Sequence, residues 1–230
     1  MAWVHPDDST LPSPLRVAEV LLKEAQSGAL WRHLSATLIR VLASFTIAMS
    51  FGAVLGLIMG RNRTINQWLN PWLIVFLNLP ALVTIVLAYI WIGLTEVAAI
   101  AAVAANKIPM VTVMLREGTK ALDPGLDEMA RSFRMSRIDR LRHVVLPQLA
   151  PHFASAARAG ISLIWKIVLV VEFLGRSNGV GFQIHLYFQL FDVAHVLAYA
   201  VSFVLVMLGV EYLVLQPMEQ RATRWRRDED

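Results

Sequence analysis

Apolar residues are concentrated in five long runs separated by polar segments. A helix that crosses a hydrocarbon core of about 30 Å needs about 20 mostly apolar residues, and every run reaches that length. The pattern therefore predicts an all-α membrane protein with about five transmembrane helices. Pro80 and Pro109 lie inside the second and third runs, where the missing amide donor predicts a kink. The predicted spans cover residues 34–60, 70–93, 95–116, 150–174 and 193–216.

Basic residues follow the first, third and fifth predicted spans. Since Lys and Arg prefer the cytoplasmic side of a membrane, the N-terminus is predicted outside and the C-terminus in the cytoplasm. The longest polar segment, residues 117–149, then also lies in the cytoplasm. The flanking basic residues are Arg61, Arg63, Arg116, Lys120, Arg221, Arg224, Arg226 and Arg227.

Residues 1–33 form a polar and amphipathic segment ahead of the predicted membrane domain (34–216), and residues 217–230 form a charged cytoplasmic tail. Residues 1–10 lack the basic start and apolar run of a cleavable signal peptide, so we expect the first span to direct insertion. An amphipathic helix at the membrane interface is predicted over residues 14–33. Its apolar side contains Val17, Val20, Leu21 and Ala25.

Composition agrees with a membrane protein and restricts its chemistry. The chain is 57% hydrophobic, with a mean hydropathy of +0.55, which exceeds what a soluble domain of this length needs. It has no cysteine, and its six histidines lack HExxH-like spacing, so we expect no metal or other cofactor in this chain. The net charge of +4 does not indicate nucleic acid binding, because the basic residues gather beside the predicted spans.

Small residues recur at every fourth position of the first predicted span. Such ridges let helices pack closely in lipid. Two interpretations stay open: an interface with a second subunit or gate, and ordinary packing within one subunit. The ridge contains Ser44, Ala48, Gly52, Gly56 and Gly60.

The longest polar segment predicts two short basic helices. Asp123 can cap a helix over about residues 124–134, which has proline at its first position. Ser136 and Asp139 have the spacing of a capping box, so a second helix should begin at Ser136 and end near Pro147. These helices could lie on anionic headgroups or dock into a groove on a partner protein, and physical arguments alone favour neither.

The same segment resembles the EAA loop of ABC importer permeases. Glu128-Met-Ala130 is followed four residues later by Arg134 and twelve residues further by Leu146-Pro147, which is the spacing of that loop. The family usually has glycine where this chain has Arg134, and a left-handed conformation there costs an arginine about 1 kcal/mol. Either the turn is reshaped, with Ser136 restarting the helix, or coupling is altered.

Two further stretches resemble permeases of the subfamily that imports nitrate, taurine, aliphatic sulfonates and thiamine precursors. They are Asn78-Leu-Pro80-Ala-Leu, and Val171-Glu172-Phe-Leu-Gly175 followed by Asn178-Gly-Val-Gly181.

The resemblance implies a type I ABC importer permease in a bacterial inner membrane, with five spans where relatives commonly have six. It implies a small anionic or polar solute, such as a sulfonate, nitrate or a thiamine-precursor-like heterocycle. The loop would be a coupling helix held by a dimer of ATP-binding subunits, which bind ATP-Mg, so the chain itself is no enzyme. Further implied partners are an external solute-binding protein, a second permease copy (a homodimer) and lipid. The residues implied in coupling are Glu128, Ala130, Arg131, Ser132, Phe133, Arg134, Ser136, Leu146 and Pro147.

Ionisable residues within spans are functional candidates because their burial in lipid is costly. One hypothesis is that Lys107 and Lys166 make the translocation pathway attractive to an anion, together with Asn78, Asn106 and Glu172. The alternative is that the two lysines pair with Glu96 or Glu172 and hold the bundle together. Glu172 could also orient the following glycine loop. The aromatic segment 175–192 either faces the solute-binding protein or anchors in the membrane interface.

A membrane-embedded enzyme and a secondary transporter are the rival interpretations. The enzyme would need a nucleophile, paired carboxylates or metal ligands, and the sequence shows no such constellation. It also lacks a phosphate-binding GxxxxGK[ST] loop and visible inverted repeats with interrupted helices.

Overall fold

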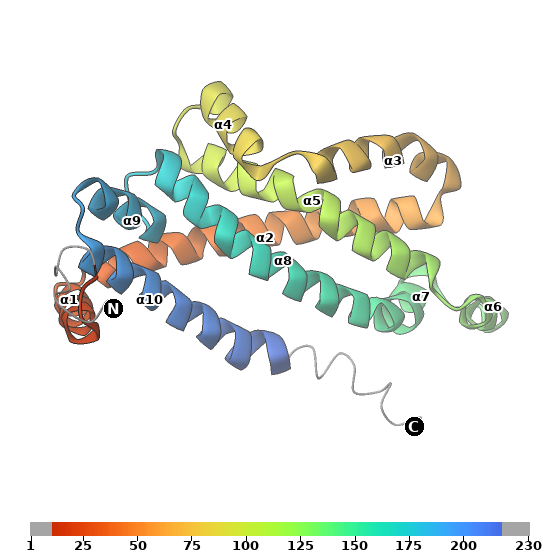
Figure 1. The fold of residues 1–230 in the computed structure, drawn as a ribbon. Helices are drawn as coiled ribbons and strands as arrows, with labels where there is room; N and C mark the ends of the chain where they lie inside the picture. The colour runs from red at the N-terminus through yellow and green to blue at the C-terminus, as the bar shows by residue number, and fades with distance from the viewer. Residues whose placement is uncertain (1–10, 218–230) are drawn as a thin grey trace, which may run out of the picture. The chain divides into compact units, whose positions relative to one another are not determined.

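The computed structural model describes residues 11–217, and every regular element in this part of the chain is a helix (Figure 1). This confirms the predicted all-α class. The predictions for residues 1–10 and for the charged tail after residue 217 lie outside the described residues. The elements are α1 (Pro14–Gln26), α2 (Ala29–Arg61), α3 (Arg63–Asn78), α4 (Ala81–Ile92), α5 (Glu96–Lys120), α6 (Pro124–Ser132), α7 (Arg137–Arg140), the π-helical turn η1 (Leu141–Val145), α8 (Leu146–Gly175), α9 (Val180–Gln189), α10 (Val193–Val210) and the π-helical turn η2 (Glu211–Leu215).

Three of these helices are long and apolar enough to cross a membrane: α2, α5 and the helix Val193–Leu215. A fourth span results if the bent pair α3 and α4 is one span. The sequence predicted about five. Helix α8, which contains the predicted span 150–174, is 30 residues long but is not among the three. It carries Arg158, Lys166 and Glu172.

The second predicted span is interrupted at Leu79 and Pro80. Leu79 is extended, with φ −69° and ψ 122°, because the ring of a proline disfavours the helical conformation of the residue before it. Pro80 also lacks the amide N–H that would continue the helix. The kink predicted here is therefore a break between α3 and α4, whereas Pro109 lies within an unbroken α5.

The N-terminal amphipathic helix is shorter than predicted. It ends at Gln26, and Gly28 adopts a left-handed conformation (φ 79°) before α2 begins, so residues 29–33 belong to α2. Its apolar side packs against α10. Val20 is buried there, and Val17, Leu21 and Ala25 are half-buried.

The helices form two units, to both of which α2, α5 and α8 contribute. Unit 1 comprises the chain up to Ser44, Pro80–Val103 and Leu163–Tyr212. Unit 2 comprises Phe45–Leu79, Ala104–Ser162 and the residues from Leu213.

In unit 2, the glycines of α2 allow a close approach to α5. A Cβ atom on Gly56 would lie 2.8 Å from the carbonyl oxygen of Thr112, and one on Gly52 would lie 2.6 Å from Cβ of Val111. Gly60 meets the same helix one turn later. The structure thus uses this side of α2 for packing within one chain.

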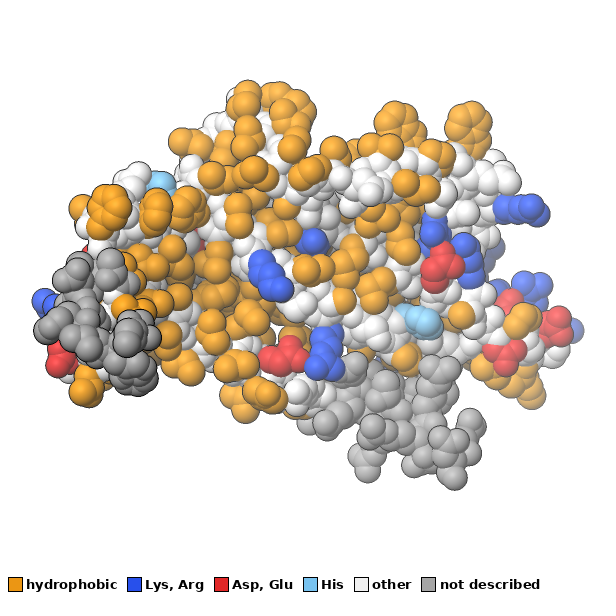
Figure 2. Space-filling model, viewed as in Figure 1, with side chains coloured by type: hydrophobic (Ala, Val, Ile, Leu, Met, Phe, Trp, Pro, Cys, Tyr) orange, Lys and Arg blue, Asp and Glu red, His pale blue; other side chains and the backbone are white. Residues whose placement is uncertain are grey.

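Large hydrophobic side chains remain exposed on the helices. On α3, Trp68 is 77% exposed, Trp72 64% and Phe76 51%, and their four-residue spacing places them on one side of the helix. Figure 2 shows hydrophobic side chains over much of the drawn face, with charged side chains of both signs gathered over α6 and α7. Exposed apolar surface of this kind suits contact with lipid.

Replacing Gly56 by Ala should lower the free energy of unfolding by about 1–3 kcal/mol, because the new methyl group meets backbone that must move. The measurement is thermal unfolding of the purified protein in detergent, followed by circular dichroism. Gly209→Ala on α10 is the matched control, since a Cβ there meets nothing within 4 Å. Equal melting temperatures for the two variants would contradict the packing described for α2 and α5.

Candidate functional site

A cluster of charged side chains in unit 1 centres on the buried Arg40 of α2, whose side chain is 3% exposed, and extends to Glu96, whose side chain is 47% exposed. Its Nε and Nη2 donate to both oxygens of Glu96, at 2.8 Å and 2.6 Å. Its Nη1 donates to Glu172 Oε1 at 2.6 Å and to the carbonyl oxygen of Asn178 at 2.9 Å. Nη2 also donates to the side-chain oxygen of Asn178. A guanidinium has five N–H donors, so these bonds use all of them.

Glu172 of α8 is fully buried and bonds on both oxygens. One oxygen accepts from Arg40, and the other accepts from the Thr37 hydroxyl at 3.0 Å and the Gly181 N–H at 2.8 Å. Arg176 adds a second cation, because its Nη2 donates to Glu96 at 2.6 Å. We call Arg40, Glu96, Glu172, Arg176 and Asn178 the Arg40 cluster. Two arginines and two glutamates balance one another within it.

The loop between α8 and α9 is attached to α2 and α8 at successive backbone amides. The N–H groups of Gly179 and Val180 donate to His33 Nδ1 at 3.1 Å and to the Thr37 hydroxyl at 2.9 Å. Because Nδ1 of His33 accepts a hydrogen bond, the proton of the neutral ring is on Nε2. This nitrogen lies 2.6 Å from the side-chain amide of Gln183. It donates, so the amide oxygen of Gln183 must face it as the acceptor.

Gly179 at the end of this loop and Gly181 at the start of α9 leave no room for a side chain. Gly179 has φ 111°, and a Cβ atom there would lie 2.3 Å from the carboxyl carbon of Glu172. A Cβ atom on Gly181 would lie 2.3 Å from the carbonyl oxygen of Leu169. The glycines therefore let the backbone approach the carboxylate closely enough to donate to it.

The Arg40 cluster has little capacity to bind a solute. All donors of Arg40 are occupied, and the charges cancel within the cluster. The arrangement instead fixes the loop 176–179 against three helices. Glu172 was predicted either to line the pathway or to orient the glycine loop. In the structure it contacts that loop.

Sequence reasoning missed Arg40. The signal was present, since an arginine lies within the first predicted span and intramembrane cations need a partner. The alternative pairing predicted for Lys107 and Lys166 is not found, because Glu96 and Glu172 bond to arginines. The pairing of Arg40 with Glu172 could not be predicted, because 132 residues separate the two in the sequence.

The other candidate pathway residues have modest contacts. In unit 2, Asn106 and Lys107 are half-buried in α5, and Asn78 is exposed, with its side-chain amide donating to the carbonyl of Ile74 at 2.8 Å. In unit 1, Lys166 is exposed on α8.

The turn between α6 and α7 is a Schellman motif built on an arginine. The N–H of Met135 donates to the carbonyl of Ala130 at 3.0 Å, and the N–H of Arg134 donates to the carbonyl of Arg131 at 2.9 Å. Arg134 has φ 51°, which is the left-handed conformation that glycine usually supplies. Arg134 thus adopts the conformation of a glycine, and Ser136 begins the next helix as predicted.

The caps of the two short helices are confirmed. Asp123 accepts from the N–H of Gly125 at 2.7 Å. Ser136 accepts from the N–H of Asp139 at 3.1 Å, and its hydroxyl donates to the Asp139 carboxylate at 2.6 Å. Ala130 is buried at 1% exposure, which fixes one side of α6. The other residues predicted in coupling are exposed: Glu128, Arg131, Ser132, Phe133, Arg134, Ser136, Leu146 and Pro147.

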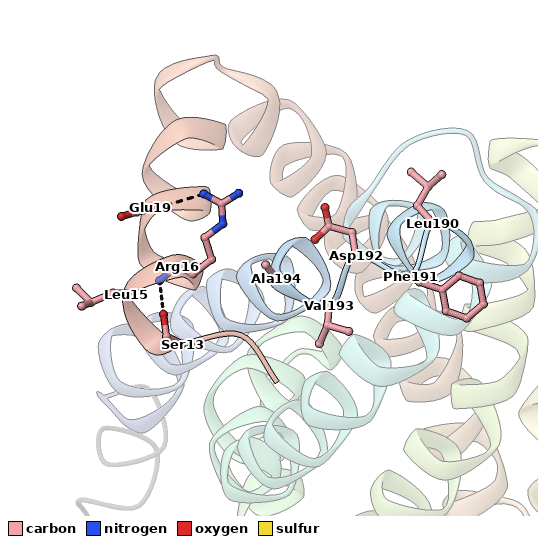
Figure 3. A pocket seen from close by; sticks show the side chains of 9 residues that line it. All are labelled: Ser13, Leu15, Arg16, Glu19, Leu190, Phe191, Asp192, Val193 and Ala194. Carbon is pink, nitrogen blue, oxygen red and sulfur yellow. Dashed lines mark hydrogen bonds and ion pairs between the residues drawn. The ribbon is translucent and has the colours of Figure 1, made fainter. Parts of the chain in front are cut away.

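A pocket of about 690 Å³ in unit 1 lies between α1 and the residues that join α9 to α10 (Figure 3). On α1 the N–H of Arg16 donates to the Ser13 hydroxyl at 3.2 Å, and its side chain pairs with Glu19 at 3.4 Å. Across the pocket, Phe191 has φ 56° and is 83% exposed. The pocket is thus lined by both polar and aromatic side chains.

The family model for the binding-protein-dependent transport system inner membrane component matches residues 52–216, which is more than half of the chain. The chain belongs to this family. The match includes α6, α7 and Glu172. The protein is therefore a multi-pass inner-membrane permease of an ABC importer.

Several curated permeases are similar in sequence. The taurine transport system permease protein TauC of Escherichia coli (strain K12) is 27% identical over 220 residues, covering 94% of this chain and 80% of TauC. The putative aliphatic sulfonates transport permease protein SsuC of the same strain is 31% identical over 172 residues, covering 75% of this chain and 65% of SsuC. The chain thus spans just under two thirds of SsuC. The bicarbonate transport system permease protein CmpB of Synechococcus elongatus is 30% identical, covering 76% of this chain and 67% of CmpB.

Solved structures show that the permease has the type I ABC importer fold. A crystal structure of an amino acid ABC transporter with histidines has a TM-score of 0.67 at 21% identity, covering 90% of this chain and 96% of that chain. An inward-facing structure of the MetNI methionine ABC transporter has a TM-score of 0.66 at 16% identity, covering 90% of this chain and 99% of that chain.

Replacing Arg40 by Met should lower the stability of the permease by about 3–5 kcal/mol, because it leaves a buried carboxylate without its cation. Thermal unfolding in detergent measures this. Replacing both Arg40 and Glu172 by Met should restore part of the loss, since an apolar pair has no uncompensated charge.

Arg16→Met is the control for this change. It breaks an ion pair whose side chains are 61% and 67% exposed, and should lower stability by less than about 1 kcal/mol. If Arg40→Met were as stable as Arg16→Met, the Arg40 cluster would not hold unit 1 together.

Replacing Arg134 by Gly should raise stability by about 1 kcal/mol, because glycine adopts the left-handed conformation without the steric cost. The control is Arg131→Gly in the right-handed α6, which should lower stability by about 1 kcal/mol. Chemical denaturation of the two variants in the same detergent checks the opposite signs. A loss of stability in Arg134→Gly would contradict the strain assigned to this turn.

Proposed function

We propose that this permease forms the path for a small anionic solute of the sulfonate class and is driven by a separate ATPase. The observation that carries the proposal is the family match over residues 52–216. Relatives named for taurine, aliphatic sulfonates and bicarbonate support a small anion. The permease itself is then not an enzyme, and ATP-Mg is bound by the partner.

The segment α6–α7 is the proposed contact with the ATPase. It is supported by the resemblance to the EAA loop and by the exposure of Glu128 and Phe133 around the buried Ala130. The Schellman turn at Arg134 gives the segment one defined geometry. A rigid, exposed segment of this kind can transmit the movement of a bound partner to the long helices α5 and α8 on either side of it.

The proposed pathway uses the cationic and amide side chains of the spans. Lys107 and Lys166 supply positive charge for an anion, and Asn78 and Asn106 supply hydrogen bonds. Among the described residues, no group of three His, Asp or Glu side chains could hold a metal ion. Glu172 acts on the glycine loop and does not contact the solute.

The proposed orientation places α6, α7 and the C-terminus in the cytoplasm. The basic residues Arg61 and Arg116 at the ends of α2 and α5 support it. The segment 175–192 is then outside, where the solute-binding protein docks, and the exposed Phe191 is available for that contact. A homodimer of the permease completes the assembly.

Glu128→Lys should abolish ATP-driven taurine uptake, because reversed charge on α6 prevents the ATPase from seating. The experiment co-expresses the permease with its ATPase and solute-binding protein, reconstitutes them in vesicles, and measures uptake together with co-elution of the ATPase. Co-elution should fall in parallel with uptake. Glu19→Lys, an equally drastic change at an exposed position of α1, should leave co-elution unchanged. Normal co-elution of the Glu128→Lys permease would contradict the proposed ATPase contact.

A further inference from the structure

A second cavity, of about 310 Å³, lies in unit 2 where α2 ends beside α7 and η1. Arg61 is the last residue of α2, and Arg137 and Arg140 are the first and last residues of α7. Three guanidinium groups therefore line one cavity. The remaining lining residues are Leu141 and Val145, which make part of its wall apolar.

The positive charge of this cavity is only partly compensated. Arg140 forms an ion pair with Asp127, and Asp127 is shared with Arg131 at 3.0 Å. Between residues 11 and 217, no ion pair is found for Arg61 or Arg137. Two arginines thus face the cavity without an acidic partner. An anion would complete the arrangement.

The lining indicates an amphiphilic anion. Arginine matches the oxygen geometry of a phosphate group with paired donors, whereas the Leu141 and Val145 side chains suit hydrocarbon. Arg61 is the last residue of a helix long and apolar enough to cross a membrane, and basic residues beside such helices can meet phospholipid headgroups. A free phosphate ion would leave the apolar part of the wall unused.

We propose that this cavity binds the phosphodiester headgroup of an anionic phospholipid, with Arg61 and Arg137 as its principal ligands. None of the five lining residues belongs to α6, but Arg137 and Arg140 belong to α7, so the lipid would lie beside the proposed ATPase contact. A bound headgroup would hold the end of α2 to α7. The lipid would thereby brace the base of the segment that turns at Arg134.

The test uses the full chain in detergent and counts bound lipid by native mass spectrometry. Phosphatidylglycerol is the probe, and phosphatidylcholine is the comparison lipid of similar size. The wild-type chain should retain phosphatidylglycerol preferentially. The double variant Arg61→Gln with Arg137→Gln should bind it about 30-fold more weakly, the factor expected from two basic contacts with an anionic surface.

The matched control is Arg63→Gln with Arg142→Gln. It removes the same charge from two exposed arginines nearby in the sequence that do not line the cavity. The control should keep its phosphatidylglycerol affinity within about 2-fold, since neither arginine lines the cavity and charge outside it is screened by salt. Arg61→Lys with Arg137→Lys keeps both charges and should retain most of the binding, which guards against failure of the glutamine variant to fold.

Three results would overturn the proposal. Equal loss of lipid in the two glutamine pairs would mean general attraction to basic surface. Displacement of the lipid by millimolar inorganic phosphate would identify a site for a free anion. Retained lipid with loss of ATPase co-elution in Arg61→Gln with Arg137→Gln would make the cavity part of the ATPase contact.

Discussion

The arrangement of unit 1 depends on one guanidinium group whose hydrogen bonds are all satisfied by protein. Arg40 joins Glu96 of α5, Glu172 of α8 and Asn178 of the following loop. A buried cation tolerates no missing partner, because an uncompensated charge in the interior costs several kcal/mol. The requirement fixes the relative positions of all four segments within this unit. The close packing of Gly179 and Gly181 against Glu172 belongs to the same arrangement.

The segment α6–α7 shows a different compromise. A Schellman turn needs a left-handed residue, and this permease places Arg134 there at a steric cost. The caps at Asp123 and Ser136 stabilise both adjoining helices and offset part of that cost. The result is a turn with a fixed direction and an arginine side chain at its tip. Its geometry is that of the glycine turn, but its surface charge differs.

The sequence predicted local features better than distant ones. The capping box of Ser136 and Asp139 involves neighbours in the chain, so it could be recognised from spacing alone. The break at Pro80 was predicted only as a kink, because a proline within an apolar run can either bend a helix or end it. The partners of Glu172 could not be deduced, since a single sequence carries no information on which of several cations in different helices meets a given carboxylate.

The order in which the Arg40 cluster is synthesised has a consequence for assembly of the permease. Arg40 precedes Glu96 by 56 residues and Glu172 by 132 residues. At ribosomal rates of 5–20 residues per second, roughly ten seconds separate the appearance of the arginine from that of its last acidic partner. Until Glu96 follows, 56 residues later, the first span carries a cation with no acidic partner, and until Glu172 follows the set of partners is incomplete. Water, headgroups or the insertion machinery must shelter that helix until α8 arrives.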